Sequence, residues 1–519
     1  MSRHALCFTN RSIGRDVRVR LRHTAAALVL VGASACGTTV PLSTTTTAQQ
    51  GQGLSSAQAG GSADGTSGTG AVTGSGSEVG SSSGGSGGMA SGGAAQTVSH
   101  GAATGGAGAT GSGALPTGAT AAGAGAPVEV GFEYASNVGA FASALGISAD
   151  VGDGQAQANA IVAYVNSHGG LAGHQIKPIF YKFDLTRTDP YTTFMAEMCT
   201  LWTEDNHVVA AFTYLNADFS PVARCLTQHH AMFSSYSLYS RDRRDFSSNA
   251  NWVETSTLSS ERLAPLQVTS LVQQGFFKGQ TKVGLLAYDH EAASRLTDGI
   301  VALLKQRGIT TVVYKVKYGG STPELSGTIS SVQSAVLKFR SENIQRVMSA
   351  AYPGAMGFFM RYADSQHYQP LYGLSSYDGL GSLPSNAPVQ QLHGAVAVGW
   401  WPTADLVMSD RPPLNAAGKI CHAVFSKAGI PASQDPFSFG YCDEVLSLQA
   451  AARQLGSTPL TGDALRAAFE HFGSAYTSPS MLGTFFSANQ RDGIARSEPL
   501  AFNDTCTCWR VRGSSTPIP

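Results

Sequence analysis

Cysteine is the residue type whose number and spacing in this sequence point most directly to chemistry. Apart from Cys7 and Cys36, the chain has six: Cys199, Cys225, Cys421, Cys442, Cys506 and Cys508. Six cysteines allow many disulfide connectivities. The spacing favours the local pairs Cys199–Cys225 and Cys421–Cys442, each joining neighbouring helices. A Cys506–Cys508 bridge would be strained across one residue, so these two could pair elsewhere, stay reduced or, less readily, bind a metal.

No other constellation of residues indicates catalysis. The sequence contains no His-Glu-x-x-His zinc motif and no Walker phosphate loop, and it has no Gly-x-Ser-x-Gly elbow outside its Gly/Ser-rich segment. His229 and His230 are adjacent, and adjacent helical residues do not share a face, which argues against a metal pair. We therefore expect no catalytic residue, no metal and no cofactor.

The N-terminus has the features of an export signal. Residues 1–23 carry six arginines and one acid, a short apolar run follows at 25–31, and small residues lead to Cys36. The run is shorter than the ~20 residues that span a bilayer. Ala33-Ser34-Ala35-Cys36 resembles a bacterial lipobox, with Ala33 where Leu is preferred. We expect a lipoprotein signal at 1–35 and lipidation of Cys36; the alternative is a plain signal peptide cleaved near Ala35.

A low-complexity segment follows the expected signal. Residues 36–127 consist almost entirely of Gly, Ser, Ala and Thr, with no aromatic residue. Such a composition buries too little apolar surface to offset the entropy of ordering. We predict a disordered linker whose root-mean-square reach is about 50–55 Å, enough to hold a globular part away from a membrane.

The remaining part, about 128–513, is long enough for two domains. The whole chain has 34 basic and 34 acidic residues. This balance gives no basic stripe of the kind that nucleic acid binding requires, so we expect no nucleic acid partner.

Strands and helices are expected to alternate along this part, which predicts the α/β class with parallel sheets and helices on both faces. The first series has strands expected at 128–134, 175–183, 207–214 and 231–236, and helices at 153–166, 190–203 and 220–229. The second has helices at 262–274, 291–307, 329–341 and 355–366, and strands at 282–288, 310–316, 346–351 and 369–375. A strand at 394–401, helices at 416–427, 443–455 and 461–472, and short strands within 482–511 follow. Ligand chemistry belongs at the carboxyl ends of the strands, where such sheets open a crevice.

Three pieces of the sequence resemble a known family. Residues 160–181 resemble a signature of the type I periplasmic (extracellular) solute-binding proteins, specifically the Leu-Ile-Val receptor-like, branched-chain amino acid group of ABC transporter substrate-binding lipoproteins. The pattern is a helix ending Asn-x-x-Gly-Gly, a further Gly and a strand ending in an acid, matched by Asn166, Gly169, Gly170, Gly173 and Asp184. Residues 282–308 are similar to the first strand and helix of the family's second lobe, and 371–378 to the strand that crosses back.

The resemblance implies two Rossmann-like lobes joined by three hinge crossings (periplasmic binding protein-like I), with a ligand between them. Carried onto this chain, the first lobe is 128–257 with 380–475, and the second is 258–379 with 476–512. The lobes would close on the ligand by hinge bending. The implied partners are a small-molecule ligand, amino acid or related, and the permease and ATPase subunits of an ABC importer. The implied location is the extracytoplasmic face of the bacterial membrane, through the lipid anchor.

The resemblance also implies where a ligand would bind. The family's ligands contact strand ends and helix N-termini, where free N–H groups suit a carboxylate, and Asp378 falls near the family's acid for an α-ammonium group. The residues at the corresponding positions are Tyr134, Asn137, Thr213, Tyr214, Asn216, Ser234, Ser235, Tyr236, Tyr288, Asp289, Tyr352, Tyr377 and Asp378.

Two positions depart from the family pattern. Asn216-Ala217-Asp218 stands where paired small hydroxyl residues are usual, and Ala292-Ala293 stands near the usual Tyr-Gly. These departures argue against an ordinary branched-chain ligand, and the aromatic candidates suit an aromatic, apolar or sugar-like face. The alternative function is a membrane-anchored ligand sensor or interaction protein with the same fold, which passes occupancy to a partner.

Overall fold

The structure is a computed structural model that describes residues 125–239, 241–317, 319, 321–350 and 354–518, and all of these belong to one compact unit. The expected signal segment, Cys36, almost all of the expected linker, and Tyr352 lie outside the described residues. The expectations for those positions therefore stay predictions.

The first part of the described chain builds a four-stranded parallel sheet in the order β2-β1-β3-β4. Its strands are β1 (Gly125–Ser136), β2 (His174–Asp184), β3 (Ala210–Thr213) and β4 (Met232–Ser235). Between and after them come α1 (Val138–Ala144), α2 (Gly154–Ser167), α3 (Tyr191–Thr200) with a π-helical turn at Leu201–Asp205, α4 (Ser220–Gln228) and α5 (Arg243–Ser248). The alternation expected from the sequence is confirmed.

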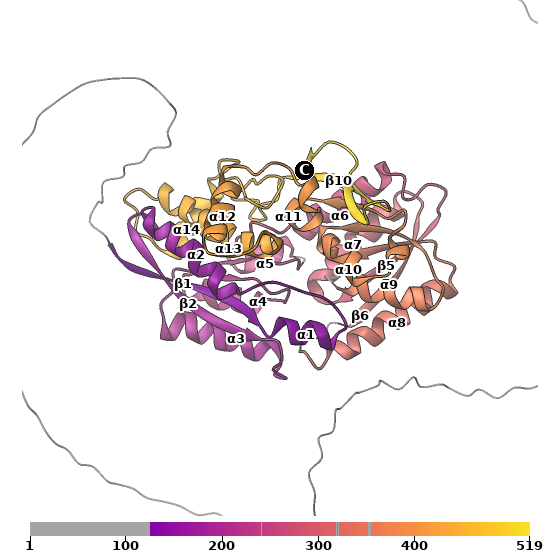
Figure 1. The fold of residues 1–519 in the computed structure, drawn as a ribbon, viewed down its shortest axis with the longest axis horizontal. Helices are drawn as coiled ribbons and strands as arrows, with labels where there is room; N and C mark the ends of the chain where they lie inside the picture. The colour runs from indigo at the N-terminus through magenta and orange to yellow at the C-terminus, as the bar shows by residue number, and fades with distance from the viewer. Residues whose placement is uncertain (1–124, 240, 318, 320, 351–353, 519) are drawn as a thin grey trace, which may run out of the picture. The chain divides into compact units, whose positions relative to one another are not determined.

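Helices cover both faces of this sheet. One face carries a core in which Phe132 packs with Ile161 of α2 and with three later helices, α12 (Ala416–Lys427), α13 (Asp435–Gln454) and α14 (Gly462–Glu470). The opposite face packs Phe183 and Phe233 against α3 and α4. In Figure 1 the orange α12–α14 lie beside the indigo α2, although about 250 residues separate them in the chain. This group of elements is called the first lobe below.

The second part builds a larger, mixed sheet in the order β11-β10-β9-β8-β7-β5-β6, with β12 also paired to β10. The strands are β5 (Lys282–Asp289), β6 (Thr310–Lys317), β7 (Arg346–Ala350), β8 (Leu371–Ser375), β9 (Val396–Gly399), β10 (Arg496–Asn503), β11 (Cys508–Val511) and β12 (Thr516–Pro517). Strands β5 to β9 are parallel, and β10 runs antiparallel to β9.

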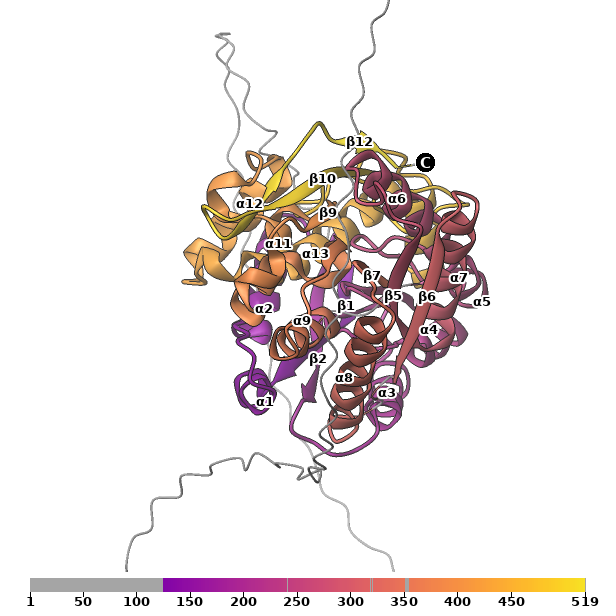
Figure 2. The ribbon, with the colours of Figure 1, turned by 90° about the vertical axis from the view of Figure 1, so that its right-hand side faces the viewer.

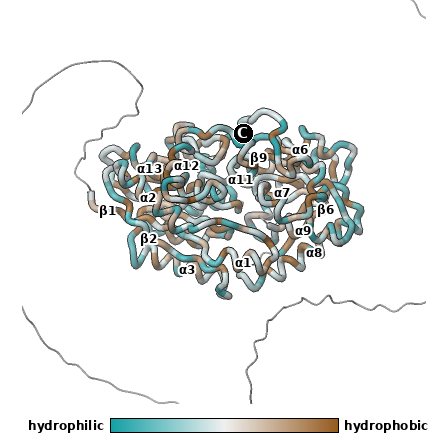
Figure 3. The backbone as a smooth tube through the Cα atoms, viewed as in Figure 1, coloured by the Kyte–Doolittle hydropathy of each residue, from teal (hydrophilic) through white to brown (hydrophobic). Residues whose placement is uncertain are grey.

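This second sheet is also covered on both faces, and with its helices it is called the second lobe. Helices α6 (Ser260–Gln273) and α7 (Glu291–Lys305) pack on one face, and α8 (Leu325–Ser341) and α9 (Ala355–Ser365) on the other. Short helices α10 (Leu383–Asn386) and α11 (Pro402–Asp405) follow β8 and β9. Figure 2 views this lobe from its outer side, with β6 beside α8 and α7. Figure 3 shows apolar and polar residues mixed along both lobes, as expected for elements with one face toward a core.

The chain passes between the sheets three times, which matches the expected three crossings. The first passage leads from β4 through about 250–259 to α6, the second from β9 to α12, and the third from α14 to β10. The first and third passages pair through a β-bridge between Glu254 and Asp492. The Asp492 carboxylate accepts from the Ser259 N–H at 2.7 Å and pairs with Arg262 at 3.0 Å. The first and third passages are therefore fastened to each other.

The lobe boundaries expected from the sequence remain a prediction. Strand β9 falls inside the range expected for the first lobe, yet it pairs with β8 and β10 of the second sheet. Residues 406–472, in contrast, contribute helices that pack on the first sheet.

The sequence signature at 166–173 has a local structural explanation. The Asn166 side chain donates to the carbonyl of Ile176 at 2.9 Å and accepts from the Ile176 N–H at 2.7 Å, which ties the end of α2 to the start of β2. Gly169, Gly170 and Gly173 all have positive φ values, between 60° and 93°, a region that side chains with a Cβ rarely adopt. The tight turn from helix to strand therefore requires these residue types.

Three disulfides are present among the described residues. Cys199–Cys225 joins α3 to α4 and Cys421–Cys442 joins α12 to α13, as the spacing favoured. Cys506 and Cys508 also form a disulfide with each other, which corrects the expectation that strain would leave them to pair elsewhere, stay reduced or bind a metal. Thr507 adopts φ of 50° at the turn between β10 and β11, and the two Cα atoms lie 5.2 Å apart, within the usual range for disulfides.

Candidate functional site

A cleft of about 420 Å³ lies where the carboxyl ends of the two sheets face each other. Its volume falls within the range of small-molecule sites. The first lobe contributes Val138, Phe141, Tyr214, Leu215, Asn216, Tyr236, Leu238, Phe437 and Tyr441, among others. The second lobe and its passages contribute Arg361, Asp378, Ser382, Leu383, Asn386 and Trp401. Most of these side chains are apolar or aromatic, and few carry charge.

Four aromatic side chains form a continuous row along the cleft. The Tyr441 and Tyr214 rings lie 3.7 Å apart between centroids, Tyr214 and Tyr236 lie 6.4 Å apart, and Tyr236 meets Trp401 edge-on at 5.0 Å. The row therefore runs from helix α13 of the first lobe to Trp401, two residues after the end of β9. The Tyr214 hydroxyl is buried and has no hydrogen-bond partner among the described residues. A buried hydroxyl without a partner is costly and is suited to meet a polar atom of a ligand.

Helix α13 positions Tyr441 of this row and a further aromatic lining residue, Phe437. Asp435 begins the helix, and Pro436 stands in its first turn, where proline's fixed φ favours initiation. Phe437 and Tyr441 are one turn apart and so share a face. A Cβ built at Gly440 would lie 2.7 Å from the Tyr236 ring, so only glycine lets that ring approach the helix this closely.

The first lobe supports the row with buried carboxyl groups. Glu133 on β1 accepts from the backbone N–H groups of Tyr214 and Leu215, at 2.7 and 3.2 Å, and so fixes the loop after β3. Burial raises the pKa of Glu133 to about 7, against the lowering effect of those two hydrogen bonds. Glu444 on α13 accepts from the Ser234 hydroxyl at 2.8 Å, and burial raises its pKa well above the usual range.

Asp378 is the acidic side chain of the second lobe's wall. It lies in the single helical turn after β8 and is 2% exposed. Its carboxylate accepts from the Ser375 N–H at 2.9 Å, which caps that turn. Burial raises the pKa of Asp378 to about 7, and hydrogen bonds from Ser349 and Ser375 oppose the rise. The group can therefore change its charge near neutral pH.

One rim of the cleft is closed by direct contacts between the lobes. The Arg361 guanidinium of α9 donates to the Gly146 carbonyl at 2.7 Å and stacks over Phe358. The Asn386 amide accepts from the Ser148 N–H at 2.9 Å. Both partners in the first lobe belong to the loop after α1, so this loop forms the edge of the cleft.

The other side of the interface carries ion pairs. His290, which precedes α7, lies 3.2 Å from the Asp218 carboxylate, and Arg295 of α7 pairs with Asp242. Asp218 also contacts Arg241 at 3.8 Å, and these interactions lower the pKa of Asp218 although burial acts in the opposite direction. Asp218 thus stabilises the contact between the lobes through its pair with His290.

The structure brings together four of the residues that the family resemblance singled out. Tyr214, Asn216, Tyr236 and Asp378 line the cleft. The Asn216 side chain accepts from the Leu238 N–H at 2.7 Å, which leaves its amide nitrogen for other contacts. That these residues bind a ligand stays a prediction.

The other candidates lie elsewhere among the described residues. Tyr134 and Asn137 line a neighbouring hollow, and the Asn137 amide donates to Asp184 at 2.8 Å. Thr213, Ser234 and Ser235 are buried at the ends of β3 and β4 beneath the row. Tyr288 is in the core, Asp289 is exposed, and the Tyr377 hydroxyl bonds to the backbone of Leu258 in the first passage.

Sequence reasoning missed several lining residues, notably Arg361, Trp401, Phe437 and Tyr441. For Phe437 and Tyr441 a sequence signal existed, because Asp435-Pro436 is typical of a helix start. The expected helix at 443–455 began too late to include it. Trp401 was placed in a strand, whereas β9 ends at Gly399 and the chain turns into the cleft. Nothing local to α9 marks Arg361.

The described part of the chain shows neither a metal-binding cluster nor a membrane-spanning helix. No group of three or more His, Cys, Asp or Glu side chains is arranged to hold a metal ion there. Within the same residues, no helix combines the length and apolar character needed to cross a membrane.

Two Rossmann-like lobes with a cleft between their strand ends define the class of two-lobed ligand-binding proteins. A family model described as periplasmic binding protein matches residues 136–497, and the chain belongs to this family. A comparison with curated protein sequences finds no match.

Solved structures of similar fold agree with this assignment. A substrate-binding protein of an ABC transporter from Aeropyrum pernix is 14% identical with a TM-score of 0.57, covering 76% of this chain and 97% of that one. A branched-chain amino acid ABC transporter protein from Thermus thermophilus with bound valine is 12% identical with a TM-score of 0.56 over the same shares. A solute binding protein from R. palustris in complex with 4-hydroxybenzoate is 13% identical with a TM-score of 0.54, covering 76% and 98%. At these identities the likeness concerns the fold.

Proposed function

We propose that this chain is the solute-binding protein of an ABC importer, held on the extracytoplasmic face of the membrane by a lipid on Cys36. It captures an amino-acid-like or related small molecule between its lobes and hands it to a permease driven by an ATPase. The observation that carries the proposal is the cleft of about 420 Å³, to which both lobes contribute side chains. Such a site changes shape when the lobes hinge, which couples binding to recognition by a permease.

The two walls of the cleft suit the two parts of such a ligand, an apolar body and a charged group. The row Tyr441–Tyr214–Tyr236–Trp401 offers aromatic faces to an apolar body. Asp378 offers a carboxylate to a cationic group, and an ammonium beside it would favour its charged form. Similar folds bind valine and 4-hydroxybenzoate, so both an aliphatic amino acid and an aromatic acid belong in the first ligand panel.

The first experiment is a thermal-shift screen of the full chain, oxidised, against amino acids, short peptides, aromatic acids, sugars and nucleosides. A ligand that binds only the folded state raises the unfolding midpoint by mass action. We expect hits among molecules with an apolar body and a charged end. A folded protein that responds to no member of the panel would contradict capture of a common nutrient and favour the sensor alternative.

A matched pair of variants tests the role of Asp378. Asp378→Asn should weaken an ammonium-bearing ligand by about tenfold or more, which is about 1.4 kcal/mol. Asp289→Asn is the control, because Asp289 is exposed at the end of β5 and does not line the cleft. Equal affinities for the two variants, measured by calorimetry, would remove Asp378 from the site.

Anchoring and transport are tested in cells. Cys36→Ser should move the protein from the membrane to the soluble fraction, because the thiol that takes the lipid is gone. Cells that lack the chain should lose uptake of the ligand found in the screen and regain it with the wild-type chain. Unchanged uptake would argue for sensing over transport.

A further inference from the structure

The three disulfides of this chain differ in what they can do for the fold. Cys199–Cys225 and Cys421–Cys442 close loops with sequence separations of 26 and 21, and all four of these cysteines pack between helices. Cys506–Cys508 has a separation of 2. A crosslink restricts the unfolded chain more as its loop lengthens, so a bridge across one residue adds little restraint.

The hairpin around Cys506 is held without its disulfide. Strands β10 and β11 pair from Leu500–Val511 to Asn503–Cys508. The Asn503 side chain accepts from the N–H groups of Thr505 and Cys506 at 3.0 and 3.1 Å, which caps the turn. The Trp509 indole donates to the Leu380 carbonyl at 2.9 Å and anchors the hairpin to the segment that carries Asp378. The fold of the hairpin therefore does not rest on the covalent bond alone.

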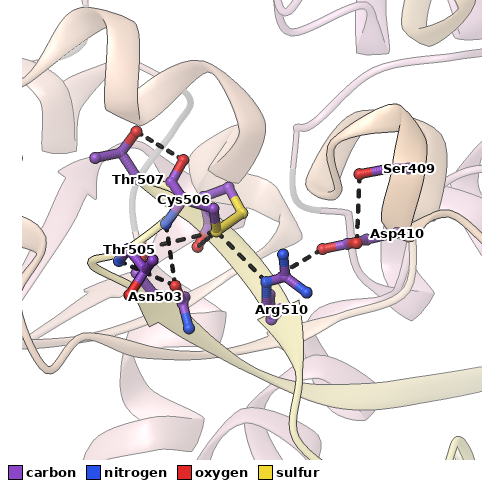
Figure 4. The surroundings of a disulfide bond; sticks show 8 residues. Ser409, Asp410, Asn503, Thr505, Cys506, Thr507 and Arg510 are labelled. Carbon is purple, nitrogen blue, oxygen red and sulfur yellow. Dashed lines mark hydrogen bonds and ion pairs between the residues drawn. A yellow bond between two sulfur atoms is a disulfide. The ribbon is translucent and has the colours of Figure 1, made fainter.

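The surroundings of this disulfide favour thiol chemistry. Cys506 is half-buried and Thr507 is exposed, whereas Cys508 is 4% exposed, so a reagent reaches the Cys506 sulfur first. The Arg510 Nε lies 3.4 Å from the Cys506 Sγ and forms an ion pair with Asp410 at 3.5 Å (Figure 4). A guanidinium beside sulfur stabilises the thiolate that forms when the disulfide opens.

We propose that Cys506–Cys508 is a redox-active disulfide that exchanges with an external dithiol, independently of which ligand binds in the cleft. One thiolate of the dithiol attacks the Cys506 Sγ; a new S–S bond forms, the Cys506–Cys508 bond breaks, and the electron pair leaves on the Cys508 Sγ, which takes a proton. The second thiolate then attacks the first dithiol sulfur and releases Cys506 as a thiolate beside Arg510. The chain is reduced to two thiols and the dithiol is oxidised to a disulfide.

The test uses the full chain with Cys7→Ser and Cys36→Ser, so that the remaining cysteines are those of the three disulfides. It is equilibrated under native conditions in buffers of reduced and oxidised dithiothreitol, alkylated, and mapped by mass spectrometry. We expect the Cys506–Cys508 disulfide to open at a lower ratio of reduced to oxidised dithiothreitol than either of the other two disulfides. The difference between these ratios should be about tenfold or more. Opening only together with Cys199–Cys225, or only on unfolding, would overturn the proposal.

Two sets of variants separate a redox role from a structural one. Cys506→Ser with Cys508→Ser should leave the unfolding midpoint nearly unchanged, whereas Cys199→Ser with Cys225→Ser should lower it. A hairpin variant that fails to fold would assign the bond a structural role and overturn the proposal.

In the reduced protein, Arg510→Gln should slow alkylation of Cys506 about tenfold near neutral pH by removing the stabilising charge. Arg512→Gln, an exposed arginine on the same hairpin, is the matched control. Equal rates for both arginine variants would remove Arg510 from the mechanism.

Discussion

The two walls of the cleft are built on different principles. The first lobe presents an aromatic face backed by buried carboxyl groups that bind their own backbone, with Glu133 beneath the Tyr214 loop. The second lobe presents a polar face in which Asp378 lines the cleft itself and Arg361 reaches across the rim. Both carboxyl groups are buried and both have a pKa raised to about 7 by that burial. Because their positions differ, Glu133 shapes the site, whereas Asp378 can contact a ligand.

The largest effect should come from removing an aromatic anchor of the first wall. Tyr441 is 4% exposed and packs against Tyr214 and the first-lobe core. Tyr441→Ala should lower the free energy of unfolding by about 3 kcal/mol or more through the lost packing and the cavity left behind. Phe437→Ala, one turn earlier and 43% exposed, should cost less than about 1 kcal/mol. Urea denaturation of both variants checks this, and equal losses would show that the row is not an anchor.

The next effect concerns pH and compares the two acids directly. In the folded state Glu133 and Asp378 hold their protons up to about pH 7, whereas in the unfolded chain such groups ionise near about pH 4. The unfolded state alone therefore loses these protons as pH rises from about 4 to 7, and wild-type stability falls across that window. Glu133→Gln and Asp378→Asn should each remove a part of this fall worth a few kcal/mol.

Chemical denaturation at several pH values measures these slopes. The comparison sharpens when ligand affinity is measured on the same proteins, because only Asp378→Asn should also weaken binding. A Glu133→Gln protein with a tenfold affinity loss would contradict the separation of roles. A slope equal to the wild type in both variants would contradict the buried, protonated state of the two acids.

A smaller effect should follow from opening the rim. Arg361→Gln removes the bond to the Gly146 carbonyl, so the closed arrangement loses about 1 kcal/mol and ligand affinity falls about fivefold, mostly through faster release. Arg340→Gln on α8 is the control, since its hydrogen-bond partner, Gln366, belongs to the same lobe. Stopped-flow release rates measure the difference, and identical rates would show that the rim contact does not hold the cleft shut.

The smallest effect belongs to the surface of the first lobe. Lys177 and Glu129 pair at 2.8 Å, but the lysine side chain is 60% exposed. Lys177→Gln should change the free energy of unfolding by less than about 0.5 kcal/mol. A larger loss in urea denaturation would mean that the edge of the first sheet depends on this pair.

The alternation of strands and helices was predictable because it rests on local patterns, such as the Asn166 and glycine signature between α2 and β2. The class of fold followed from the same motifs. Pairing over long distances was not predictable: no local pattern tells that β10 joins β9 or that α12–α14 return to the first sheet. The short helix α1 was missed because its N-cap, Asn137, is left-handed and makes no side-chain cap.

The candidate site was predictable only in part, for a related reason. Residues that directly follow strands, such as Tyr214, Tyr236 and Asp378, can be found by counting along the chain, and these line the cleft. Residues that reach the cleft from the side of a helix or from a passage between lobes, such as Arg361 and Trp401, depend on how the lobes meet. Strand ends also contain residues turned to the core, such as Tyr288, and counting does not separate the two kinds.

The hydrogen bond from Trp509 to the Leu380 carbonyl joins two segments that lie far apart in the sequence. Trp509 follows Cys508 directly, and Leu380 lies two residues after Asp378. Thermodynamic reciprocity applies to any pair of sites joined in this way: the factor by which reduction of the disulfide changes ligand affinity must equal the factor by which ligand changes the reduction equilibrium. A measurement of ligand affinity in the oxidised and the reduced protein therefore also gives the shift of the reduction equilibrium that the ligand would cause.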